Sequence, residues 1–122
     1  MNTRRTVTVQ TIDRGPVTIE EPPWCIAAHD RPEFLVDVWH EGEEVPLLVA
    51  TPCHGRVPLL TATVVQKPFA TDAAVHLAVD IDGDAHELSS VQVRALANEL
   101  VTLGADALQR LADRVESFEG GA

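Results

Sequence analysis

Every strand-like pattern in this sequence lies before residue 89, and one long helix-like segment follows it. Residues 91–118 contain no proline, and at about 100° per residue their apolar side chains gather on roughly half of the helix circumference. Because strands and helices do not alternate along the chain, a parallel doubly wound sheet is disfavoured. The sequence therefore predicts an α+β fold, with a mainly antiparallel sheet of five to six strands packed by one long C-terminal helix.

Six segments have the β-branched composition or the alternation that is typical of strands, namely residues 6–12, 16–19, 34–40, 45–51, 59–67 and 75–81. Turn residues at 13–15, 41–44 and 82–83 predict hairpins, the last of them leading into a short strand at 85–88. Residues 20–33 and 52–58 are rich in proline and predict irregular loops, the first with one helical turn at 26–29.

The C-terminal segment is long for a domain of this size. Ser89 and Gln92 match a capping box and place the helix start there. A continuous helix over 91–118 would measure ~42 Å, against a diameter of ~35 Å for a compact chain of this length. A kink at Gly104 would shorten the helix, or a second copy of the chain would pack against its apolar face. We expect a single domain over residues 1–122, with flexible ends at 1–5 and 119–122, that forms a homodimer through this helix.

Acidic residues outnumber basic ones by 19 to 9, which gives a formal net charge of −10. This charge opposes binding to phosphate backbones and to anionic lipids, so we expect no direct nucleic-acid or membrane partner. No apolar run approaches the ~20 residues that cross a bilayer, and residues 1–5 do not open a signal peptide. We expect a cytoplasmic protein. The acidic segments 41–44 and 80–84 leave open an acidic decoy or inhibitor that binds a basic partner.

Metal-ligating residues are concentrated in one stretch of the chain, at Cys25, His29, His40, Cys53 and His54. Cys25 and His29 are four residues apart, so a helical turn or a tight loop would bring both to one ion. Zinc accepts thiolate and imidazole ligands in tetrahedral geometry, and Cys53 or His54 would complete the site. The spacing is loose, however, and two buried free cysteines with separately packed histidines would also produce it. A Cys25–Cys53 disulfide is disfavoured because cytosolic thiols are normally reduced.

Several short motifs together resemble a family of small proteins, abundant in actinobacteria, that is classified as a domain of unknown function. The motifs are Pro23-Trp24-Cys25 with His29, then Asp37, then His40-Glu41-Gly42, and finally the segment from Leu88 to Ala97. The resemblance extends over about residues 6–115 and implies no activity.

The resemblance does imply that Cys25, His29 and His40 belong to one shared feature, and this favours zinc binding. Cys53 and His54 match no element of the family. If neither is a ligand, the fourth position falls to water, to Asp37 or to a group that the sequence does not identify.

These observations favour a non-enzymatic, zinc-stabilised binding or regulatory module with an unidentified protein partner. Trp24 and Trp39 would form its recognition surface, since a tryptophan ring combines a large apolar area with one polar group. The alternative is a small zinc hydrolase with water on the metal and Asp30, Asp37 or Glu41 as the general base. No H-E-x-x-H motif supports that alternative.

Overall fold

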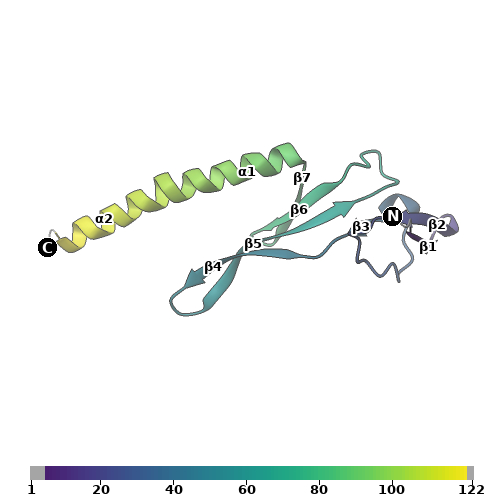
Figure 1. Cartoon of the computed structure of the whole chain (residues 1–122), viewed down its shortest axis with the longest axis horizontal. Coiled ribbons are helices and arrows are strands. Elements are labelled where there is room, and N and C mark those ends of the chain that lie inside the picture. Colours follow the sequence, from purple (N-terminus) through teal and green to yellow (C-terminus); the bar gives the residue numbers. More distant parts are fainter. Residues whose placement is uncertain (1–4, 121–122) are drawn as a thin grey trace. The chain divides into compact units, whose positions relative to one another are not determined.

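The computed structural model describes residues 5–120, which form two units, residues 5–89 and 90–120 (Figure 1). The first unit contains seven strands in two antiparallel sheets, and the second is helical. The predicted α+β class is therefore confirmed. Of the predicted flexible ends, residues 1–4 and 121–122 lie outside the described part of the chain, whereas Arg5 begins a strand and Gly120 ends a helix.

The smaller sheet is a hairpin of β1 (Arg5–Thr11) and β2 (Gly15–Glu21), as the sequence predicts. Alternation along the strands turns Val9 and Ile19 to the same side, where they pack with Val38 in a buried apolar cluster. The turn is closed by Thr11, whose Oγ1 donates to the Gly15 carbonyl at 2.7 Å and accepts the Arg14 N–H at 2.9 Å. Gly15 has a φ of 65°, which a glycine adopts without steric cost.

The larger sheet has five strands arranged around the long strand β5 (Gly55–Gln66). One edge of β5 pairs with β3 (His40–Glu41) at its C-terminal end and with β4 (Val45–Thr51) over its N-terminal part. The other edge pairs with β6 (His76–Ile81), which pairs in turn with β7 (Asp84–Leu88). Its buried apolar side chains are Leu60, Ala62, Val65 and Val79. The predicted hairpin at residues 82–83 is confirmed, and Asp82 and Gly83 both have positive φ.

The prediction of a strand over residues 34–40, paired with 45–51, is wrong. Leu35–Asp37 forms a single 3₁₀ turn, η1, and the strand is reduced to His40–Glu41, which pairs with β5. A contact with the first hairpin explains the difference, because the Leu35 N–H donates to Asp13 Oδ1 at 2.9 Å. Val38 then enters the apolar cluster of that hairpin. Tertiary contacts here outweigh the β-propensity of the apolar residues.

The prediction of an irregular loop over residues 52–58 is also wrong. Thr51 closes a tight turn onto Gly55, with Oγ1 donating to the Gly55 carbonyl at 2.8 Å, and β5 starts there. Pro58 is tolerated within β5 because the register shifts opposite it, between Leu47 and Leu48, and pairing with β6 starts only at Thr61. The missing N–H of Pro58 therefore removes no hydrogen bond from the pairing between β5 and β6.

The second unit is one continuous helix of 31 residues. It consists of α1 (Ser90–Thr102), a π-helical turn η2 (Leu103–Leu108) and α2 (Gln109–Gly120). Gly104 lies inside the π-helical turn, and the helix continues through it. Among the described residues, no helix has the length and apolar character that crossing a membrane requires.

Candidate metal centre

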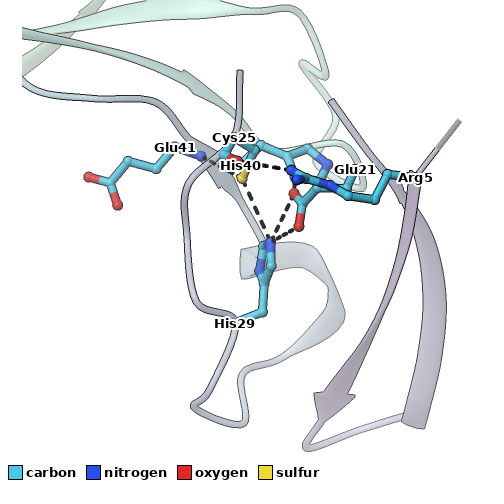
Figure 2. Close-up of polar contacts among 6 residues, drawn as sticks. All are labelled: Arg5, Glu21, Cys25, His29, His40 and Glu41. Atoms are coloured by element: carbon cyan, nitrogen blue, oxygen red, sulfur yellow. Dashed lines mark hydrogen bonds and ion pairs between the residues drawn. The ribbon is translucent and has the colours of Figure 1, made fainter. Parts of the chain in front are cut away.

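Four side chains converge on one point in the first unit, and they come from three separate elements (Figure 2). Glu21 ends β2, Cys25 and His29 belong to the loop that follows, and His40 begins β3. One potential ligand atom of each side chain lies within 4.8 Å of the others. The structure thus brings together three of the five predicted ligands and adds Glu21.

Glu21 is turned inward by the alternation of β2. The side chains of Val17, Ile19 and Glu21 share one face of the strand, and Glu21 is only 8% exposed. A carboxylate at this depth needs hydrogen-bond donors, because an isolated buried charge is costly. The cluster supplies them through the imidazoles of His29 and His40.

The loop after β2 is tied to β3 by backbone hydrogen bonds. The Ile26 N–H donates to the Glu41 carbonyl at 2.8 Å, and the Glu41 N–H donates to Cys25 Sγ at 3.4 Å. From the other side, Arg5 Nη2 in β1 donates to the Cys25 carbonyl at 3.1 Å (Figure 2). The predicted helical turn at residues 26–29 is wrong, because these contacts with neighbouring strands take the place of intrahelical hydrogen bonds.

His29 has a left-handed backbone, with a φ of 51°. This conformation is uncommon for a residue with a side chain and costs on the order of 1 kcal/mol. It belongs to the loop conformation in which the imidazole meets Glu21 and Cys25 (Figure 2). Strain of this kind is found where the surrounding structure over-determines a functional conformation.

The carboxylate of Glu21 bridges the two imidazoles. His29 Nε2 lies 3.1 Å from Oε1 and 3.0 Å from Oε2, and His40 Nδ1 lies 2.9 Å from Oε1. Cys25 Sγ lies 3.8 Å from His29 Nε2. The imidazole rings of His29 and His40 are almost perpendicular, with centroids 5.8 Å apart. The potential ligand atoms are thus gathered around the Glu21 carboxylate.

The cluster changes the acidity of two of its members. Burial raises the pKa of Glu21, but hydrogen bonds from Cys25, His29 and His40 and the charge of His29 outweigh it, so this pKa lies below its usual value. Burial and the Glu21 carboxylate raise the pKa of the Cys25 thiol. At neutral pH the metal-free cluster therefore holds an ionised carboxylate beside a protonated thiol.

The lowered pKa of Glu21 predicts a loss of stability of the metal-free protein in acid. A depressed pKa contributes stability above the unfolded-state pKa, near ~4.3, and this contribution is lost as the pH falls through the lower folded-state pKa. We expect the urea midpoint of the native chain, kept metal-free with a chelator, to fall more steeply between pH 5 and 3 than that of Glu21→Gln under the same conditions, because the variant has no carboxylate to titrate at this position. If the urea midpoints of the two proteins fall in parallel with pH, the ionised Glu21 carboxylate does not contribute to stability in this way.

Cys53 and His54 lie away from the cluster, in the turn between β4 and β5, and both are exposed. This turn has the same hydrogen-bond pattern as the turn of the first hairpin. Cys53 and His54 occupy the positions after Thr51 that Asp13 and Arg14 occupy after Thr11. The turn and the His40 pairing lie at opposite ends of β5, which at ~3.3 Å per residue are about 36 Å apart. The structure does not bring these two predicted ligands to the site, and both cysteines are free thiols.

The two tryptophans are half-buried and flank the cluster. Trp24 packs edge-on against His40, with ring centroids 6.2 Å apart. Trp39 lines a cavity of about 190 Å³ together with Val9, Ala28, His29 and Glu41. The Lys67 ammonium lies 6.0 Å from the centroid of the Trp39 ring. One wall of this cavity is therefore the loop that carries Cys25 and His29.

Glu21 is the one member of the cluster that was not predicted as a metal ligand from the sequence. It stands beside Glu20, and the pair has the appearance of a solvated acidic surface. The available signal was the alternation of β2, because counting by two from Val17 and Ile19 places Glu21 on the buried face. A charged residue on a buried face, four residues before a cysteine, indicates a partner in the interior.

Fold and site together define an α+β protein with a buried Glu-Cys-His-His cluster that could hold a metal ion. The chain belongs to the family described as "Domain of unknown function (DUF6907)", whose model matches residues 6–117. This confirms the predicted membership in a domain-of-unknown-function family. No curated protein and no solved structure matches the chain.

Proposed function

We propose that this protein is a zinc-stabilised binding module in which zinc is held by Glu21, Cys25, His29 and His40. The supporting observation is the spacing of the ligand atoms. Tetrahedral zinc, with bonds of ~2.0–2.3 Å, requires ~3.3 Å between its nitrogen and oxygen ligands and ~3.6 Å between sulfur and nitrogen. Three of the six distances between ligand atoms here are 2.9 Å, 3.1 Å and 3.8 Å, and all four atoms lie within 4.8 Å of one another, so shifts of about 1 Å or less would admit the ion.

The chemistry of the ligands favours zinc over other biological cations. One thiolate, two imidazoles and one carboxylate form a mixed set that suits a borderline-soft ion, whereas magnesium and calcium select oxygen ligands. Copper and nickel bind strongly to nitrogen and sulfur ligands, but their preferred arrangements are usually planar or trigonal.

The role we assign to zinc is structural. Four side chains of the protein would fill a tetrahedral shell, whereas a zinc hydrolase keeps one position open for water. The ligands come from the end of β2, the following loop and β3, so the ion would link the small sheet to the large one. Zinc would also fix the loop that forms one wall of the Trp39 cavity.

The binding role rests on the surface that this loop presents. Trp24 and Trp39 are half-buried, so each exposes part of a large ring. The Trp39 cavity holds about 190 Å³, enough for a side chain or a small group of a partner molecule. Zinc would pre-organise this surface and so reduce the entropy cost of binding.

The proposal is tested by measuring the metal content of protein purified without an affinity metal column. We expect about one zinc per chain in the native protein and in Cys53→Ala, and a loss of nearly all zinc in Cys25→Ala. Cys53 is the matched control because it is the second cysteine of the chain and lies outside the cluster. Circular dichroism of each variant establishes that the sheet content is retained.

Two results would overturn the proposal. Native protein that contains no zinc, and takes up none when zinc is added, would reduce the cluster to a hydrogen-bonded network around Glu21. Equal zinc contents in Cys25→Ala and Cys53→Ala would place the ion elsewhere. If Cys25→Ala does not fold, Cys25→Ser provides the same test with a side chain closer in size and polarity.

A further inference from the structure

The helix of the second unit carries an apolar seam that is symmetric about its centre. In its N-terminal half, apolar side chains recur at spacings of three and four, at Val93, Leu96, Leu100 and Leu103. In its C-terminal half the same spacings recur in reverse, at Leu108, Leu111, Val115 and Phe118. Spacings of three and four keep side chains on one face of an α-helix.

The two halves are joined by a step of five residues, which in an α-helix would rotate the second half off the seam. That step is the π-helical turn, Leu103–Leu108. In a π-helix the hydrogen bonds run from residue i to i+5, so residues five apart lie about one turn apart. The π-helical turn therefore aligns Leu103 with Leu108 and makes the seam continuous. Leu103 and Leu108 are 56% and 64% exposed.

Reversing the helix superimposes the seam on itself. With the centre between residues 105 and 106, Leu103 exchanges with Leu108 and Leu100 with Leu111. Farther out, Leu96 exchanges with Val115, and Val93 with Phe118. A two-fold interface requires this property, because residue i of one copy contacts residue j of the other and the reverse. Small residues 104, 105 and 107 lie at the centre, where the two backbones would approach most closely.

One pair of charged residues close to the seam is also complementary under this reversal. Glu99 of one copy falls near Arg114 of the other, and both lie on the same side of the seam. This opposite-charge contact occurs twice in a two-fold pair, whereas a parallel pair in register would place each charge beside its own copy.

We propose that two copies of this chain associate through an antiparallel pairing of these helices, centred between residues 105 and 106. The interface requires no metal, so it is independent of the proposed zinc site. Sedimentation velocity of the full-length chain is expected to show a dimer at micromolar concentration. Leu108→Glu is expected to raise the dissociation constant by about 100-fold or more, because each dimer would bury two unpaired charges. Val101→Glu, an equally apolar position about 120° from the seam, is the matched control and should remain dimeric.

The orientation is tested with one introduced cysteine per chain in a Cys53→Ser background, in which the remaining Cys25 is buried. A two-fold antiparallel pair places residue 93 beside residue 118 of the other copy. Neither Val93→Cys nor Phe118→Cys alone should form a disulfide, but an equimolar mixture of the two variants should form a mixed disulfide under mild oxidation. Efficient self-linkage of either variant would indicate a parallel pair and overturn the proposal. A native chain that remains monomeric at 100 μM would also overturn the proposal. The apolar seam would then pack against something other than a second copy of the chain.

Discussion

Removing zinc with a chelator is expected to lower the melting temperature of the strand-containing unit by about 15 °C or more. A ligand that binds only the folded state stabilises it by about 4 kcal/mol when its free concentration is a thousand times its dissociation constant. In a domain of under 100 residues, each kcal/mol corresponds to about 4–8 °C. Differential scanning calorimetry with and without chelator measures the shift, and added zinc should reverse it.

The matched control is the same treatment of Cys25→Ala, which lacks the only thiolate of the cluster. Its melting temperature should already be low and should not respond to chelator. Cys53→Ala should respond as the native protein does. An unchanged melting temperature in chelator-treated native protein would contradict a structural role for zinc, even if the ion is present.

Glu21→Gln is expected to weaken zinc binding by more than about 100-fold. The substitution keeps the size of the side chain but removes the charge and the anionic oxygen that would bind the metal. Losing a group that only orients a ligand typically costs 10–100-fold in metal affinity, and losing a ligand costs more. Glu20→Gln is the matched control, because Glu20 is the preceding residue of β2 and is exposed. Competition with a chromophoric chelator measures both affinities.

Equal zinc affinities of Glu21→Gln and Glu20→Gln would contradict the ligand role of Glu21. The site would then have three protein ligands, Cys25, His29 and His40, and an open position. That outcome would favour the zinc hydrolase over the structural site. The measurement on Glu21 thus separates the two functions that the sequence left open.

The sequence predicted what local patterns determine. The hairpins at residues 13–15 and 82–83 follow from alternation and turn residues, and the C-terminal helix from its apolar stripe. What local patterns do not contain was predicted wrongly. The strand at 34–40 was replaced by a 3₁₀ turn because Asp13, from a distant turn, holds the Leu35 N–H. The packing of the C-terminal helix on a sheet stays a prediction.

The candidate metal site was predicted in part. Cys25, His29 and His40 were selected as ligands by residue type and spacing, and the structure brings them together. Cys53 was included because cysteines and histidines are concentrated in that stretch of the chain, whereas Thr51 and Gly55 close a hairpin turn in which Cys53 is exposed. The sequence contains the pattern Thr-x-x-x-Gly at both hairpins, and comparing the two turns would have excluded Cys53.

The shortness of β3 determines when the candidate metal site can form during biosynthesis. β3 has two residues, and within residues 5–120 its strand partner is the far end of β5 alone, where His40 pairs with Gln66. A nascent chain that has not reached Gln66 contains all four ligands but lacks the strand that orients His40. Non-local pairings of this kind form slowly compared with local hairpins. On the proposed role of zinc, capture of the ion would therefore follow assembly of the larger sheet, and a chain that stalls earlier would carry its ligands unassembled.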